Sequence, residues 1–199
     1  MARRKARWLA LSLALLLPAC HDSRSRFEIW RQAHAVEVDA YVAFLEAQQV
    51  DGVVPMAQLL RSGRNWRLCR AEEFAVPPRS TWPNIVPTLR LLRELKRSGL
   101  LARAEVASVY REPDLNRCEG GSTASRHLAN AALDLDIYSE PARIAKLCEA
   151  WRARGPALAW GFGFYRPGKI HLDTSGFRTW GSDHHVGTSL CTADPKLSR

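Results

Sequence analysis

The sequence contains no C-x-x-C pair, no internal repeat and no low-complexity tract. The first absence argues against a zinc site built from cysteines, and the other two argue against a repeat architecture or a disordered chain. A length of 199 residues suits one domain with a full core. The composition, 46% hydrophobic and 25% charged, is that of an ordinary globular protein.

The sequence also lacks a basic run that would fit a nucleic acid. The formal net charge is +9, but four of the positive charges lie in the first seven residues (Arg3, Arg4, Lys5, Arg7), which leaves +5 for the rest. No nucleic-acid-binding module accompanies this charge. We therefore expect no nucleic-acid partner, and a moderately basic surface that suits acidic polymers or an anionic envelope.

No apolar run reaches the roughly 20 residues that span a bilayer. The longest follows the basic N-terminus, covers residues 8–17 and ends at Leu17-Pro18-Ala19-Cys20. This pattern is typical of a secretory signal, and its last four residues resemble a bacterial lipobox. The resemblance implies a lipoprotein signal peptide over residues 1–19 and a lipid on Cys20; the alternative is ordinary secretion with Cys20 as a bystander.

Where a Gram-negative sorting rule applies, His21 in place of Asp after the lipidated cysteine directs the protein to the outer membrane, facing the periplasm. We expect residues 20–26 to form a polar tether. Residues 27–199 are expected to form a single domain, joined to the membrane by the lipid anchor.

Four further cysteines remain in this exported chain: Cys69, Cys118, Cys148 and Cys191. An even number in an oxidising compartment indicates disulfides, with three possible pairings. We favour Cys69 with Cys118 and Cys148 with Cys191. The alternative is four buried free thiols.

The apolar pattern predicts an α+β fold, with N-terminal helices packed on a small antiparallel sheet. Helices are expected over residues 27–49 and 55–60, around residues 89–95 up to Ser98-Gly99, and from Pro141 onward. Strands are expected over residues 106–110 and 132–138 and on both sides of the turn Arg166-Pro167-Gly168. Residues 74–83 contain three prolines and are expected to be extended or turned.

The alternation of side chains in strands allows His127, Asp134 and His171 to lie together, provided that the chain folds back between the first two. Residues seven apart in a strand point to opposite faces, so His127 can meet Asp134 only from a loop that folds back over the strand. Asn130 stands where this reversal is needed, and Asn tolerates left-handed backbone. His171 and Asp173 share the polar face of the later strand. Two imidazoles and one carboxylate leave a fourth tetrahedral position open, as in a catalytic zinc site.

Taken singly, a histidine is more often a surface or hydrogen-bonded residue than a ligand. The joint pattern is more specific. The run Ser125-x-His127-x-x-Asn130-x-Ala132-x-Asp134 resembles the Ser-x-His-x-x-Gly-x-Ala-x-Asp signature of the zinc D-alanyl-D-alanine carboxypeptidase family. That family shares its fold with lysostaphin-type endopeptidases, D-Ala-D-Ala dipeptidases and the hedgehog signalling domain.

Two further segments resemble the same family and extend the match over about residues 105–181. The segment at residues 170–174, with Arg178 and Trp180 behind it, is similar to the second half of the family's site, and residues 109–113 with Asn116 are similar to the segment before the first motif. The resemblance implies that His127, Asp134 and His171 are the zinc ligands.

The resemblance also implies roles for two neighbours. Arg111 would hold a carboxylate of the substrate, a task that suits a planar guanidinium, with Arg178 as a rival for this role. Ser125 would orient the first ligand or the substrate, unless it is a plain turn serine.

Asn130 and Gly168 depart from the family pattern. Asn130 replaces a glycine, which the backbone tolerates. Gly168 stands where many relatives carry an acidic general base, three residues before the last histidine. Asp173 is the nearest substitute as catalytic base, but it could instead support a ligand histidine. Asp136 has the same supporting potential.

Downstream, Asp183, His184 and His185 form a polar cluster that could supply an acid or base or belong to a tail.

These observations predict an exported zinc metallopeptidase that hydrolyses an amide bond in peptidoglycan stem peptides, in the manner of a D-Ala-D-Ala carboxypeptidase. One alternative is a zinc-containing lipoprotein that binds peptidoglycan without cutting it, which the glycine at position 168 favours. Another is an endopeptidase of the same fold, or an enzyme of that fold with a different substrate.

Overall fold

The structure, a computed structural model, describes residues 23–137 and 141–192. The expected signal peptide and Cys20 lie outside the described residues. Among the helices of the described part, none combines the length and the apolar character that crossing a membrane requires.

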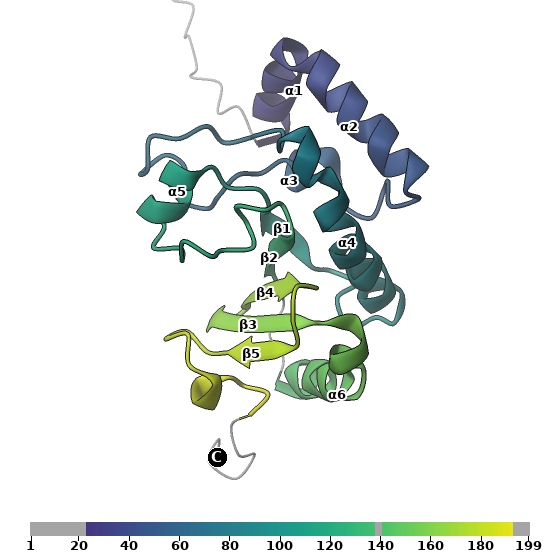
Figure 1. Ribbon diagram of the computed structural model, residues 1–199, viewed down its shortest axis with the longest axis vertical. Coiled ribbons are helices and arrows are strands. Elements are labelled where there is room, and N and C mark those ends of the chain that lie inside the picture. Colours follow the sequence, from purple (N-terminus) through teal and green to yellow (C-terminus); the bar gives the residue numbers. More distant parts are fainter. Residues whose placement is uncertain (1–22, 138–140, 193–199) are drawn as a thin grey trace, which may run out of the picture.

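The helix expected over residues 27–49 is in fact two helices, α1 (Ser23–Ala33) and α2 (Ala35–Ala47). The break falls at His34, whose ring nitrogen donates a hydrogen bond to the Trp30 carbonyl at 2.8 Å. The imidazole also stacks on the Trp30 indole, with ring centroids 4.2 Å apart. These contacts hold the turn between the helices and allow α2 to change direction, as Figure 1 shows.

The tether expected over residues 20–26 is helical from Ser23 onward, because α1 begins there. The side chain of Arg26 forms an ion pair with Glu73, with 2.7 Å between Nε and Oε2. This contact fixes the first turn of α1 to the body of the chain.

The next helices are α3 (Met56–Leu59), with Pro55 as its N-cap residue, and α4 (Trp82–Arg97), which follows a short 3-10 turn. Helix α4 begins earlier than the leucine pattern indicates, because Pro83 occupies its first turn, where a missing N–H costs nothing. It ends before Ser98-Gly99, as predicted, and Gly99 has a φ of +81°. The two prolines at 77 and 78 lie outside the helices, so the extended segment stops at residue 78.

Five strands form one sheet in the order β1-β2-β4-β3-β5. Their bounds are β1 Glu105–Ser108, β2 Ala132–Asp136, β3 Gly161–Arg166, β4 Lys169–Asp173 and β5 Arg178–Trp180. The α+β class is confirmed. The sheet is mixed rather than wholly antiparallel, because β5 passes beyond β4 and pairs in parallel with β3 at the edge.

The two faces of the sheet have different chemistry. One face is apolar and joins α4 and α6 (Pro141–Leu158) in the main hydrophobic core. Its buried side chains are Leu133, Leu135, Phe162, Phe164, Ile170 and Leu172. The opposite face carries Asp134 and His171, which are direct partners across β2 and β4. In Figure 1 α6 lies against the sheet at one end of the molecule and α1 and α2 lie at the other.

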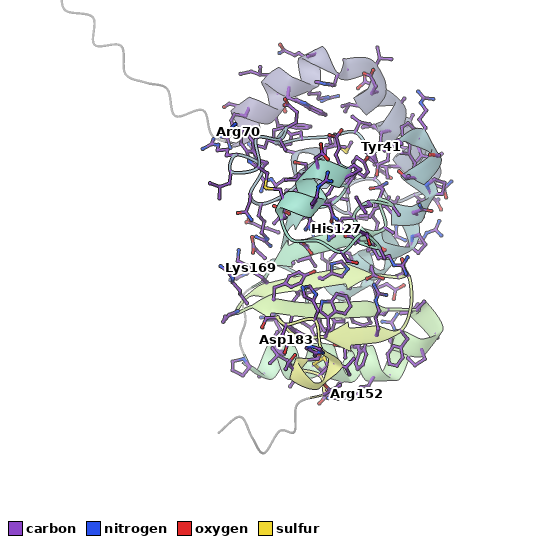
Figure 2. All side chains as sticks on the ribbon, turned by 60° about the vertical axis from the view of Figure 1, so that its left-hand side comes forward. Tyr41, Arg70, His127, Arg152, Lys169 and Asp183 are labelled. Carbon is purple, nitrogen blue, oxygen red and sulfur yellow. A yellow bond between two sulfur atoms is a disulfide. The ribbon has the colours of Figure 1, made fainter. Side chains whose placement is uncertain are left out.

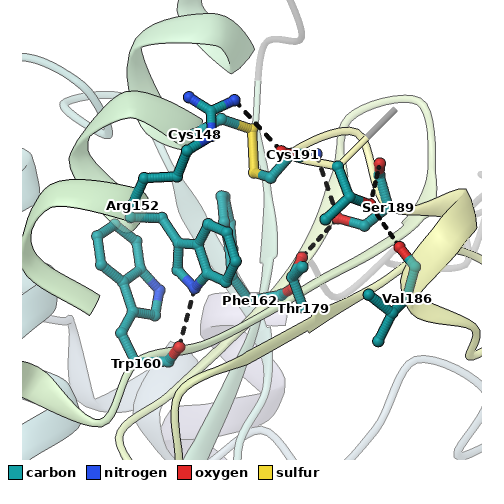
Figure 3. Close-up of a disulfide and its surroundings, with 10 residues drawn as sticks. Cys148, Arg152, Trp160, Phe162, Thr179, Val186, Ser189 and Cys191 are labelled. Carbon is teal, nitrogen blue, oxygen red and sulfur yellow. Dashed lines mark hydrogen bonds between the residues drawn. A yellow bond between two sulfur atoms is a disulfide. The ribbon is translucent and has the colours of Figure 1, made fainter. Parts of the chain in front are cut away.

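Both expected disulfides are present in the structure. Cys69–Cys118 joins the loop after α3 to α5 (Pro113–Cys118), with 5.9 Å between the Cα atoms. The sequence predicted a polar loop at α5, although Pro113 and Asp114 are typical of a first helical turn. Cys148–Cys191 fastens the segment after β5 to α6, where Arg152 also donates a hydrogen bond to the Cys191 carbonyl (Figure 3).

Candidate metal centre

The predicted fold-back between His127 and Asp134 is present. His127 lies on the loop before β2, and Asn130 has a left-handed φ of +51°. The Ala131 N–H then donates to the Arg126 carbonyl at 2.9 Å, which closes the turn. Figure 2 shows His127 where this loop meets the sheet. The reversal brings a loop histidine over the face that Asp134 shares with the last predicted ligand.

Three potential ligand atoms converge at this place. His127 Nε2 lies 3.2 Å from Asp134 Oδ1, His171 Nδ1 lies 3.1 Å from the same oxygen, and the two nitrogens are 3.3 Å apart. The edges of a tetrahedron with zinc bonds of 2.0–2.1 Å are about 3.3–3.4 Å. The three atoms therefore fit three corners of a tetrahedral zinc site, and the fourth corner remains for a water or substrate oxygen.

The outer nitrogen of each histidine is held by an acceptor. His127 Nδ1 donates to the Val109 carbonyl at 2.6 Å, and His171 Nε2 donates to Asp173 Oδ2 at 2.9 Å. In the neutral rings, these hydrogen bonds leave the lone pairs on the inner nitrogens, which face each other and the Asp134 carboxylate. Metal-binding histidines in proteins are typically held in this way. The donor set and its tautomers fit a zinc ion.

Burial and charge act on these ligands in opposite directions. All three are buried. Burial lowers the pKa of His127. Burial alone would raise the pKa of Asp134, but His127, His171 and Arg111 together hold it well below its ordinary value. Burial likewise opposes protonation of His171, yet its hydrogen bonds to Asp134 and Asp173 raise its pKa. Asp134 is therefore kept ionised, the state in which it can bind a cation.

Arg111 is buried beside the centre and is already engaged. Its Nη2 contacts Asp134 Oδ2, its Nε donates to Ser108 Oγ at 2.9 Å, and Nε lies 3.1 Å from Glu119 Oε2. The guanidinium thus orients the oxygen of Asp134 that faces away from the histidines. This contact fits an arginine that supports a ligand, whereas the sequence predicted one that holds a substrate carboxylate.

The predicted catalytic base, Asp173, is completely buried and has no free oxygen. Oδ2 accepts from His171 and from Arg178 Nη2 at 2.6 Å, and Oδ1 accepts from the Ser175 N–H at 2.8 Å. It lies on the side of His171 opposite the ligand atoms. The structure therefore favours the supporting role for Asp173 over the base. It also occupies Arg178, the rival candidate for binding the substrate.

Two glycines of β3 make room for these contacts. A Cβ on Gly161 would lie 2.5 Å from Asp173 Oδ2 and 2.8 Å from Arg178 Nη1, and a Cβ on Gly163 would collide with the Trp180 indole. Since Arg178 and Trp180 belong to β5, their side chains must cross β3 to reach β4. The alternation of glycine on this face of β3 allows that crossing.

We expect Gly161→Ala to lower the free energy of unfolding by about 1–3 kcal/mol, the usual cost of overpacking. The added methyl group would push apart the Asp173–Arg178 pair and loosen His171. Urea unfolding of the zinc-loaded protein measures the change. Gly187→Ala is the matched control, since a Cβ there meets nothing within 4 Å. Equal losses in the two variants would contradict this account of β3.

Ser125 and Gly168 have backbone roles in the structure. Ser125 Oγ accepts a hydrogen bond from the His127 N–H at 3.4 Å, which agrees with a residue that orients the first ligand. Gly168 lies in the turn between β3 and β4 with a φ of +75°, and its carbonyl accepts from the Ile137 N–H at 2.8 Å. The family's base position is here a turn that favours glycine.

An open groove of about 1010 Å³ runs along the centre, and Arg111 and Asp134 form part of its wall. Three further groove residues were missed by the sequence argument or left open in it: Glu119, Tyr165 and His184. Glu119 accepts from the Asn65 N–H at 2.7 Å and pairs with Arg111. It follows Cys118 directly, so the cysteine pattern was the one signal that could have drawn attention to it.

Tyr165 and His184 lie together in this groove, with ring centroids 6.1 Å apart. Burial, followed by the charge of Asp134, raises the pKa of Tyr165, and the nearby indole N–H of Trp180 acts in the opposite direction. No sequence signal marked Tyr165, because it looks like one more aromatic residue of a strand.

The remaining acidic candidates do not reach the metal centre. Asp183 Oδ1 accepts from the His185 N–H at 2.9 Å and from Thr188, so this carboxylate holds a local turn. Asp136 pairs with Arg64 at 2.7 Å and with Lys169 at 3.5 Å at the rim of the groove, rather than supporting a ligand.

Comparison with known proteins agrees with this geometry. A family model described as Peptidase M15 matches residues 70–173, slightly more than half of the chain. The matched stretch contains His127, Asp134 and His171. The chain belongs to the Peptidase M15 family. M15 peptidases are zinc-dependent, and the three converging residues form a group that could bind the metal. No curated protein and no solved structure matches the chain.

Proposed function

We propose that this M15 peptidase hydrolyses an amide bond in peptidoglycan stem peptides, in the manner of a D-Ala-D-Ala carboxypeptidase. The observation that carries the proposal is the convergence of His127 Nε2, Asp134 Oδ1 and His171 Nδ1 within 3.3 Å of one another, beside an open groove. A zinc ion bound there supplies a Lewis acid that activates water and polarises the scissile carbonyl.

The chain's own residues prepare the site for this chemistry. Val109 and Asp173 hold the two histidines in the tautomers that direct their lone pairs inward. Arg111 keeps Asp134 ionised and oriented. Pairing of β2 with β4 places Asp134 beside His171, and the hydrogen-bonded turn from Arg126 to Ala131 places His127 over them.

The groove supports a peptide substrate that carries carboxylates. Its walls contain basic side chains from α1, from the loop after α3, from the end of β3 and from the start of β4: Arg24, Arg26, Arg61, Arg64, Arg166 and Lys169. Stem peptides bear free carboxylates, which such side chains attract. Arg111 and Arg178 are engaged with aspartates, and Arg26, Arg64 and Lys169 of the rim pair with Glu73 and Asp136. We therefore assign recognition of the substrate carboxylate to the exposed Arg24 and Arg166.

The test is incubation of the zinc-loaded protein with defined muropeptides, followed by mass spectrometry of the products. We expect loss of one terminal D-Ala residue. An internal cut would identify the alternative, an endopeptidase. Binding of muropeptides with full zinc content but no cleavage would overturn the enzymatic proposal and leave a binding lipoprotein.

We further propose that the protein is exported and held at the outer membrane by a lipid on Cys20, facing the periplasm. The disulfides Cys69–Cys118 and Cys148–Cys191 support an oxidising compartment. We expect Cys20→Ala to move the protein from the membrane fraction of cells to the soluble periplasmic fraction, as judged by immunoblotting. Retention of the variant in the membrane fraction would exclude the lipid anchor.

A further inference from the structure

Tyr165 presents its hydroxyl to the metal centre from β3. The strand alternates, so Phe162 and Phe164 enter the core while Gly161, Gly163 and Tyr165 face the opposite side. The Tyr165 hydroxyl lies 3.4 Å from His171 Nδ1, the nitrogen that points toward Asp134 and His127. Tyr165 also lines the groove. A substrate carbonyl bound at the fourth corner of the site would therefore lie beside this hydroxyl.

Within the part of the chain that the structure describes, His171 Nδ1 is a hydrogen-bond partner of this hydroxyl. In the neutral tautomer that can bind a metal, His171 Nε2 donates to Asp173, so Nδ1 carries a lone pair and can only accept. In that tautomer the Tyr165 hydroxyl is the donor of the 3.4 Å contact. A zinc ion held by His127, Asp134 and His171 would occupy the lone pair of Nδ1, and the hydroxyl hydrogen would then be available to a ligand in the groove.

The position of Trp180 also favours the Tyr165 hydroxyl as a hydrogen-bond donor. Its indole lies over Gly163 and beside the His171 ring, with centroids 5.1 Å apart. The buried Nε1 completes no hydrogen bond within the part of the chain that the structure describes, yet it lies close enough to the Tyr165 hydroxyl to affect its ionisation. An indole N–H can only donate. The tyrosine oxygen is thus the natural acceptor, and its own hydrogen remains for another group.

We propose that Tyr165 is a catalytic residue that donates a hydrogen bond to the oxygen of the scissile carbonyl as this oxygen becomes an oxyanion, with Trp180 as its positioning residue. The inference rests on the proposed function. In the reaction, water oxygen bonds to the carbonyl carbon and the π pair moves to the carbonyl oxygen. The C–N bond then breaks and the amine gains a proton that comes from the water. Tyr165 keeps its proton throughout and stabilises the charge.

The first test is Tyr165→Phe in the zinc-loaded protein. We expect kcat for muropeptide hydrolysis to fall about 10²- to 10³-fold, as for removal of other oxyanion donors, with KM within about threefold and zinc content unchanged. Tyr110→Phe is the matched control, because Tyr110 does not line the groove and should keep its kcat. An unchanged kcat in Tyr165→Phe would overturn the proposal, and so would loss of zinc, which would make the tyrosine a support of the metal site.

A second readout does not depend on the substrate. Acetohydroxamate presents anionic oxygen to a bound zinc ion, and calorimetry measures its affinity for the wild type and both variants. We expect Tyr165→Phe to bind it about 10-fold or more weakly, since a hydrogen bond to a charged group is lost. If the wild type cleaves no muropeptide but this difference appears, the proposed function fails and the donor role of Tyr165 stands. Equal affinities would overturn the donor role, whatever the muropeptides show.

Discussion

His171→Ala is expected to lose stoichiometric zinc and to lower hydrolysis about 10³-fold or more, since a metal contributes several kcal/mol to stabilising the transition state. Two of the three converging atoms, His127 Nε2 and Asp134 Oδ1, would remain 3.2 Å apart. Two protein ligands hold zinc poorly, and Asp134 would also lose the hydrogen bond from the 171 position. Metal analysis after dialysis against trace zinc measures the loss directly.

His185→Ala is the control for this variant. His185 is exposed at the turn before the last 3-10 helix, and its hydrogen bonds to Asp183, Gly181 and Thr188 are made by its backbone N–H and carbonyl. It should keep one zinc per chain. A chelator should lower the melting temperature of the wild type and of this control, because bound metal stabilises the folded state. It should leave His171→Ala unchanged. Full zinc content in His171→Ala would refute the assignment of ligands.

Much of the metal site could be predicted because side chains alternate between the two faces of a strand, which limits which residues can meet. The alternation around Asp134 and His171 placed both on the polar face, and the seven-residue distance to His127 required a reversal at Asn130. The structure has this reversal, with a left-handed Asn130. Local pattern and motif together were sufficient here, since the ligands lie on strands and on the loop that leads directly into one of them.

The partners of the ligands could not be predicted in the same way. The roles of Arg111 and Asp173 depend on which side chains lie within about 3 Å in three dimensions, and sequence spacing does not contain this information. Asp173 looked available because it shares a strand face with His171. It is saturated because β5 returns in parallel beside β3 and brings Arg178 across the two glycines. A three-residue edge strand gives too short a pattern to recognise.

The boundaries of the N-terminal helices also could not be predicted from sequence spacing alone. Leucine spacing located α4, but its start depends on Pro83 in the first turn, and the break between α1 and α2 depends on the contact of His34 with Trp30. Apolar periodicity continues through such a break, because both helices pack on the same core. Tertiary contacts of single side chains decide these boundaries.

Asp173→Ala separates support from base catalysis, the two roles that the sequence left open. If Asp173 supports His171, zinc affinity should fall about 10- to 100-fold, and excess zinc should restore most of kcat. If Asp173 is the base, zinc affinity should be retained and kcat at saturating zinc should fall about 10²- to 10⁴-fold. We expect the first result, because both oxygens of Asp173 are occupied and the side chain is fully buried.

Asp136→Asn is the matched control, since Asp136 lies two residues from a ligand but faces Arg64 and Lys169 at the rim. Competition with a zinc chelator gives the affinities of both variants, and kcat is measured at several zinc concentrations. Asp173→Asn is the second variant: it keeps the size of the side chain, so a loss of affinity there reports the charge and the hydrogen bond rather than a cavity. A kcat that stays low at saturating zinc in both Asp173 variants, with wild-type affinity, would return the base role to Asp173.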